Sequence, residues 1–133
     1  MRYYLSHAIR GKVGPGASHD VQAKNCAEAK RVANILRTLF PKLELYVPAE
    51  NEIFIQIAYD SGFLNENAIL DVDCRIIDTL DGVLVYVPDG DELQGGRKIE
   101  YGHAVATNKP VCIFHKVEEA ADYIEAQYRR ELI

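Results

Sequence analysis

Gly82-Val83-Leu84-Val85-Tyr86-Val87 is the stretch of this sequence that decides the fold. It is a continuous apolar run of strand length, and it lies between Asp81 and Pro88. Strands that are covered on both faces have this composition, which is typical of parallel sheets. We therefore expect residues 82–87 to form a central parallel strand.

Segments of strand and helix character alternate on both sides of this run. The pattern predicts further strands at 2–7, 43–47 and 111–114, and helices between Ser18 and Pro41 and at 51–61, 65–80, 97–107 and 117–132. Such alternation implies parallel strands joined by right-handed crossovers. We expect an α/β three-layer sandwich with a small parallel sheet, of flavodoxin or Rossmann type. Residues 1–133 should form a single domain, because no linker or repeat interrupts them.

The composition of the chain argues against several kinds of binding partner and location. A net charge of −5 argues against binding to nucleic acid polymers, because neutralising phosphates needs clustered Lys and Arg. No apolar run approaches the roughly 20 residues of a membrane-spanning helix, and no N-terminal signal segment is evident. Cys26, Cys74 and Cys112 are widely separated and predict buried free thiols of a cytoplasmic protein. The four histidines lack the spacing of metal ligands, so we expect no metal site.

Asp73 interrupts the apolar stripe of the predicted helix 65–80. The apolar members recur at helical spacing: Ile69, Val72, Ile76, Ile77 and Leu80. Asp73 is four residues after Ile69, so it should face the same way. A buried carboxylate is costly unless it is paired, and an apolar setting keeps it protonated, which makes it a candidate proton donor. The plainer alternative is a core acid bonded to a backbone group or to a Tyr.

Glu100 follows the glycine pair Gly95 and Gly96, near the start of the predicted helix 97–107. Glycines let the backbone approach a ligand closely, because no Cβ intrudes. The helix dipole favours a first-turn carboxylate by about 0.3–1 kcal/mol, so we expect Glu100 to be ionised at neutral pH. A carboxylate nucleophile together with a proton donor such as Asp73 is the equipment of a retaining glycosidase. The alternative is that Glu100 merely helps the helix to start.

Arg10 and Lys12 form the only positive cluster of the loop 8–17, beside Gly11. An Arg fork and exposed backbone N–H groups suit a phosphate or a carboxylate. Ligands of parallel sheets bind outside the carboxyl ends of the strands. The segments 7–16 and 88–96 should therefore face one crevice. The alternative is a surface loop with two solvated cations.

Several segments together carry a family resemblance. They are Val85-Tyr86-Val87-Pro88-Asp89, the glycine pair, Glu100-Tyr101-Gly102-His103-Ala104 and Leu45-Tyr46-Val47-Pro48. These segments resemble the strand, loop and nucleophile helix of the nucleoside 2-deoxyribosyltransferases, and their second strand. The eight-residue separation of Asp73 and Asp81 is also similar to that of the family's base-contacting Asp and the Asp that opens its central strand.

The resemblance implies roles for individual residues. Glu100 would attack the anomeric carbon, Asp73 would contact the base, and Tyr4 would orient Glu100. The run Ala8-Ile9-Arg10-Gly11 is similar to the branch that hydrolyses deoxynucleoside 5′-monophosphates, whose loop holds the phosphate. The substrate-binding residues expected on this basis are Ser6, His7, Arg10, Gly11, Gln94, Gly95 and Gly96. The resemblance further implies a homodimer or larger homo-oligomer that needs no cofactor.

The chain also departs from its apparent relatives. Gln94 stands where the transferases carry an Asp and the nucleotide hydrolases a Ser, and Ala8 replaces a phosphate-binding Ser. We expect hydrolysis or base exchange at the N-glycosidic bond of a deoxynucleoside or its 5′-monophosphate. One alternative is a phosphoribohydrolase of the cytokinin-activating type, although Leu93-Gln94 and Arg97-Lys98 flank the glycines in place of that group's Pro and Gly-Thr. The other is a nucleotide-sensing module that binds without cleaving.

Overall fold

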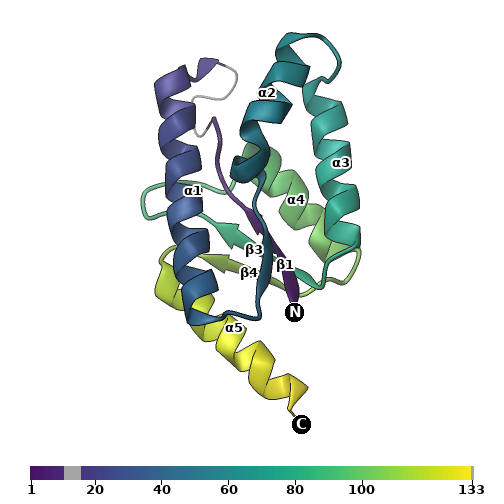
Figure 1. Cartoon of the computed structure of the whole chain (residues 1–133). Helices are drawn as coiled ribbons and strands as arrows, with labels where there is room; N and C mark the ends of the chain where they lie inside the picture. The colour runs from purple at the N-terminus through teal and green to yellow at the C-terminus, as the bar shows by residue number, and fades with distance from the viewer. Residues whose placement is uncertain (11–15, 133) are drawn as a thin grey trace.

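A computed structural model of the chain describes residues 1–10 and 16–132 (Figure 1). The predicted binding residue Gly11 and its neighbour Lys12 lie outside the described residues. The strands are β1 (Arg2–Ser6), β2 (Glu44–Tyr46), β3 (Gly82–Tyr86) and β4 (Val111–Phe114). They form one sheet of order β2-β1-β3-β4, in which every neighbouring pair is parallel. The predicted α/β class and the central position of β3 are confirmed.

Among the described residues, five α-helices and one short 3₁₀ helix accompany the strands. They are α1 (His19–Leu39), η2 (Pro48–Asn51), α2 (Glu52–Asp60), α3 (Glu66–Asp78), α4 (Gly95–Ala106) and α5 (Val117–Glu131). The side chain of Ser18 accepts a hydrogen bond from the Val21 N–H, and that of Asn65 accepts one from the Ala68 N–H. Because these bonds satisfy N–H groups that have no partner within the helix, Ser18 and Asn65 fix where α1 and α3 begin.

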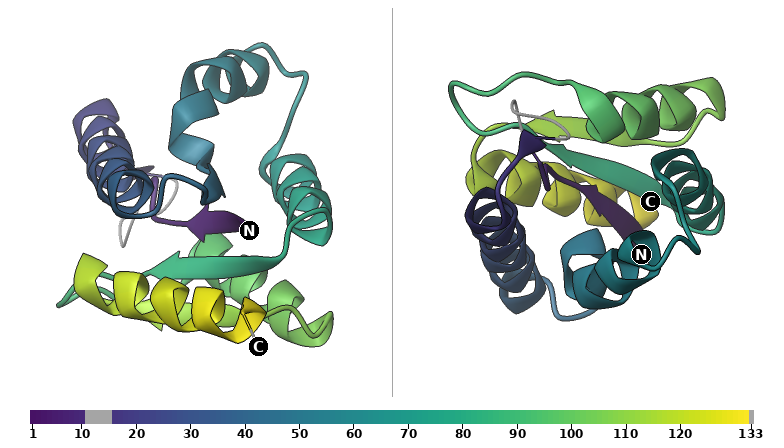
Figure 2. Two further views of the ribbon diagram at one scale, coloured as in Figure 1. Left: turned by 60° about the horizontal axis from the view of Figure 1, so that its bottom comes forward. Right: turned by 90° about the horizontal axis from the view of Figure 1, so that it is seen from above.

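The sheet and the helices on its two faces form three layers (Figure 2). Helices α1 and α5 pack on one face, and α3 and α4 pack on the other. Side chains alternate along a strand, so β1 sends Tyr3 and Leu5 to the α1–α5 side and Tyr4 and Ser6 to the α3–α4 side. The α3–α4 side therefore receives two hydroxyl groups from the middle of the sheet.

Helix α4 begins at Gly95, two residues earlier than predicted, which moves Glu100 from the first turn to the second. Glycine is a poor helix former, so the sequence pattern placed the start after the pair. The backbone at Gly95 has φ +60°, a conformation that favours glycine. At Gly96 a Cβ would lie 3.2 Å from the Leu70 Cδ2, so glycine here permits the close approach of α4 to α3.

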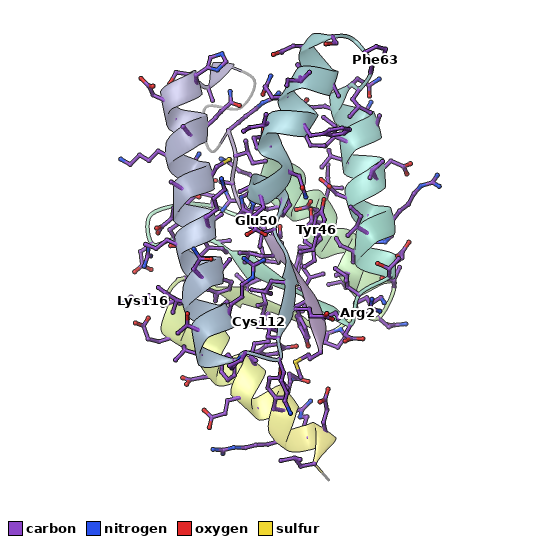
Figure 3. The ribbon with its side chains drawn as sticks, viewed as in Figure 1. Arg2, Tyr46, Glu50, Phe63, Cys112 and Lys116 are labelled. Carbon is purple, nitrogen blue, oxygen red and sulfur yellow. The ribbon has the colours of Figure 1, made fainter. Side chains whose placement is uncertain are left out.

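One residue of the predicted apolar stripe of helix 65–80 is exposed instead. Val72 is 48% exposed, because it lies beyond the edge of the stripe that α3 buries. Helix α2 has no buried residue, and Phe63 points outward from the tip of the α2–α3 connection (Figure 3). The prediction of three buried thiols is only partly right, since one is buried and two are half-buried: Cys26, Cys74 and Cys112. Within residues 1–10 and 16–132, no helix combines the length and apolarity needed to cross a membrane.

Candidate active site

A pocket of about 350 Å³ lies beyond the carboxyl ends of β1 and β3. Its walls come from the segment that follows β1 (His7–Arg10), from α2 and α3, and from the first turns of α4. This is where a parallel sheet presents its ligand crevice. Of the two loops expected to meet there, the described parts that reach the pocket are His7–Arg10 and Gln94–Gly96.

Glu100 is held inside this pocket by two hydroxyl groups from β1. The Tyr4 hydroxyl donates to the Glu100 Oε2 at 2.5 Å, and the Ser6 hydroxyl donates to the Oε1 at 2.7 Å. Tyr4 and Ser6 point to the same face because they are two residues apart on one strand. Glu100 is only 5% exposed, so both carboxyl oxygens are fixed by protein donors away from bulk water.

Asp73 reaches the same point from α3. Its carboxyl lies close enough to Glu100 and to Tyr4 to interact with both, and the residue is half-buried. The structure therefore brings together the three residues predicted to be catalytic, Asp73, Glu100 and Tyr4. Tyr46 stacks on Tyr4 with ring centroids 5.6 Å apart, and it lies between α2 and α3 in Figure 3.

Burial changes the acidity of both carboxyls. It raises the pKa of Glu100 to about 7, although the Tyr4 and Ser6 hydroxyls act in the opposite direction. It also raises the pKa of Asp73 to about 6. The apolar setting expected for Asp73 is present, but the expected position of Glu100 in the first turn of its helix is wrong. Glu100 lies in the second turn, where the dipole is weak, and burial beside a second carboxyl dominates.

The two carboxyls titrate as a pair. Because each feels the charge of the other, the first proton to leave belongs to the pair and not to one residue. Because burial raises the pKa of both carboxyls, the pair can hold a proton near neutral pH. The Tyr4 and Ser6 hydroxyls stabilise the state in which Glu100 is charged and Asp73 carries that proton.

His7 lines the pocket, but both of its ring nitrogens are engaged. The Ala49 N–H donates to Nε2 at 3.1 Å, so Nε2 is an acceptor and the ring proton is on Nδ1, which donates to the Ala8 carbonyl at 2.9 Å. Burial lowers the pKa of His7 to about 4, which keeps the ring neutral. His7 thus fastens the segment after β1 to η2.

Arg10, the expected phosphate anchor, also lines the pocket. Its guanidinium is paired with the Glu66 carboxylate at the start of α3, and it lies 5.3 Å from the centre of the Tyr59 ring. The Arg10 side chain is 23% exposed and that of Glu66 is 56% exposed. The Arg10 charge that was predicted to bind a phosphate is therefore already balanced by the Glu66 carboxylate.

Gln94, Gly95 and Gly96 reach the pocket at the start of α4, as predicted. Gln94 occupies the N-cap position, but its side chain makes no capping hydrogen bond. Its Nε2 is buried and has no hydrogen-bond partner among the described residues. A buried donor without an acceptor is unfavourable, so this amide suits an acceptor atom of a ligand.

Arg97 is a pocket residue that sequence reasoning missed. It is 3% exposed, donates to the Tyr86 carbonyl at 2.9 Å and to the Glu92 carbonyl at 3.1 Å, and pairs with Asp91 at 3.0 Å. These contacts fix the loop between β3 and α4. Its position three residues before Glu100 on the same helix face was the available signal. Glu52 and Glu66 were also missed, because each resembles an ordinary first-turn acid.

No protein-family model, curated protein or solved structure matches this chain. In the part of the chain that the structure describes, no group of three or more His, Cys, Asp or Glu side chains could hold a metal ion.

Proposed function

We propose that this protein cleaves the N-glycosidic bond of a deoxynucleoside or a deoxynucleoside 5′-monophosphate. The observation that carries the proposal is the close pair of carboxyls of Asp73 and Glu100, both with a pKa raised by burial, in the pocket at the end of the sheet. This reaction needs one carboxylate that attacks the sugar and one carboxylic acid that protonates the leaving group. The sequence resemblance supplies the substrate class.

In the first step a Glu100 carboxylate oxygen attacks C1′ of the sugar. The bond from C1′ to the base nitrogen breaks, its electron pair stays with the base, and Asp73 gives the base a proton. The products are a free base and a sugar bound to Glu100 through an ester-type bond. In the second step water attacks C1′, Asp73 takes the proton of the water, and Glu100 is released. A second base in place of water gives exchange.

The arrangement of the carboxyls favours the covalent route. An inverting enzyme needs a separation of about 6.5–9.5 Å, because a water molecule must act from the opposite face of the sugar. Asp73 and Glu100 interact directly, which leaves no room for a water molecule to act in that way. Tyr4 and Ser6 hold the Glu100 oxygens, so the nucleophile keeps one orientation.

We also propose that the chain acts in the cytoplasm as a homodimer or larger homo-oligomer. The sequence resemblance implies the assembly, and exposed apolar side chains on α2 support it, since large apolar surfaces of this kind often mark contacts between proteins. Ile53 is 81% exposed, Phe54 73% and Ile57 62%. The three free cysteines agree with a reducing compartment.

One assay tests the cleavage. The purified protein is incubated with deoxynucleosides, ribonucleosides and their monophosphates, and the free base is followed by chromatography. Glu100→Gln should lower the rate by about a thousandfold or more, since it removes the nucleophile. Asp73→Asn should lower it by about a hundredfold or more, whereas Asp71→Asn, on the exposed side of the same helix, should leave it unchanged.

Two results would overturn the proposal. One is the absence of base release from every substrate, which would leave only a binding module. The other is an undiminished rate in Glu100→Gln. Addition of a second free base then separates exchange from hydrolysis, because only exchange gives a new nucleoside.

A further inference from the structure

The ion pair of Arg10 and Glu66 lies inside the same pocket as the paired acids. Arg10 comes from the segment after β1, and Glu66 is the first residue of α3. The Tyr59 ring of α2 lies against the guanidinium. Three elements therefore meet at this point of the pocket wall, and the charge of Arg10 is balanced there.

Helix α3 sets the distance between this ion pair and the reacting acids. Glu66 and Asp73 are seven residues apart, so they lie on one face of α3. At 1.5 Å per residue this separation is about 10 Å, comparable to the length of a nucleoside. In the proposed reaction the base lies at Asp73 and C1′ at Glu100. The 5′ end of the sugar can then extend to Arg10 and Glu66.

The described lining residues carry more acid than base. The carboxyl groups are those of Glu52, Glu66, Asp73 and Glu100, and the guanidinium groups are those of Arg10 and Arg97. Both guanidinium groups are already paired, Arg10 with Glu66 and Arg97 with Asp91. Among the described residues of the pocket wall, no cation remains unpaired for a phosphate.

We propose, on the basis of the proposed function, that Glu66 selects a neutral 5′ end, so that the preferred substrate is a deoxynucleoside with a free 5′-hydroxyl. A hydroxyl can donate to the Glu66 carboxylate and accept from Arg10 at the same time. A phosphate can only accept, so it must displace Glu66 from Arg10 and remain beside the freed carboxylate. Glu66 is then a specificity-determining residue for the 5′ substituent.

The kinetic test compares kcat/KM for a deoxynucleoside and its 5′-monophosphate. The wild-type protein should prefer the deoxynucleoside by about tenfold or more, as expected for a charge-assisted contact that the phosphate must break. Glu66→Gln keeps the shape of the side chain and should lower this preference by about tenfold. Glu50→Gln removes another carboxylate that pairs with an arginine, Arg37, but does not line the pocket, so the preference should not change.

A titration with inorganic phosphate tests the charge selection without any reaction. Calorimetry should give tighter phosphate binding to Glu66→Gln than to the wild-type protein, and the gain should disappear in the double variant with Arg10→Met. Equal phosphate affinity of the wild-type protein and Glu66→Gln would overturn the inference, as would a wild-type preference for the monophosphate. A complete lack of base release would overturn the proposed function, while the phosphate titration would still decide whether Glu66 selects charge.

Discussion

Replacing Glu100 with Gln should stabilise the protein at high pH. In the folded chain the pKa of Glu100 is raised by burial to about 7, from an ordinary value of 4.5. Between these pH values the folded state keeps a proton that the unfolded state has lost. Stability therefore falls as the pH rises through this range, and above about pH 7 the whole cost of the buried charge is present. Gln is never charged, so the variant avoids this cost.

The size of the effect follows from the two pKa values. A change from 4.5 to about 7 corresponds to about 3 kcal/mol, at 1.36 kcal/mol for each pH unit. Gln has nearly the shape of Glu, and its amide oxygen can still accept from Tyr4 or Ser6. The difference between variant and wild-type protein should thus be small at pH 4 and reach about 3 kcal/mol at pH 8. For a chain of this length that gain corresponds to about 10 °C in Tm.

Urea unfolding at pH 4, 6 and 8 measures the difference directly. Glu119→Gln is a control of opposite sign, because the Glu119 carboxylate accepts from the backbone N–H groups of His115 and Lys116, which lower its pKa. That variant should lose stability at pH 8 and lose less at pH 4. If Glu100→Gln shows the same free energy difference from wild type at pH 4 and pH 8, the reasoning about the buried pair is refuted.

Two further substitutions test the surroundings of the pair. Tyr4→Phe removes the hydroxyl that donates to Glu100 at 2.5 Å, so the pKa of Glu100 should rise. The acid side of the pH–rate profile should then move to higher pH, and kcat should fall about ten- to hundredfold. Arg97→Met should lower the free energy of unfolding, measured by urea unfolding, by about 3 kcal/mol, because it leaves Asp91 without its buried partner. Arg129→Met, which breaks an exposed pair, should change it by less than about 1 kcal/mol, and an equal loss in both would reject the role given to Arg97.

The sequence was sufficient for the fold because local signals agreed with the global arrangement. The apolar run 82–87 contains β3, and the side chains of Ser18 and Asn65 cap α1 and α3 as their residue types predict. The errors lie where tertiary packing overrides propensity. Helix α4 begins within the glycine pair, where Gly96 lies close to Leu70, and a pattern of apolar residues does not record that contact.

The candidate site was predictable only in part. Asp73 could be found because it breaks a periodic pattern. The partner of Arg10 could not be found, because Glu66 lies 56 positions away and resembles a routine helix-start acid. The ring nitrogens of His7 are likewise occupied by backbone groups that only the folded chain brings together. Pairing across distant segments decides which charges are available, and composition does not report it.

The polar cluster at the centre of the α3–α4 side is best explained by its acting as a unit. Tyr4 and Ser6 occupy strand positions that an apolar pair could fill, and they donate to an acid that burial makes weak. If the Glu100 charge stabilised the fold through these hydrogen bonds, removing it would destabilise the chain at high pH. A cluster that holds an unfavourable buried charge predicts the reverse above about pH 7. The pH dependence of Glu100→Gln therefore shows whether the folded chain holds such a charge, and the release of free base shows whether a reaction uses it.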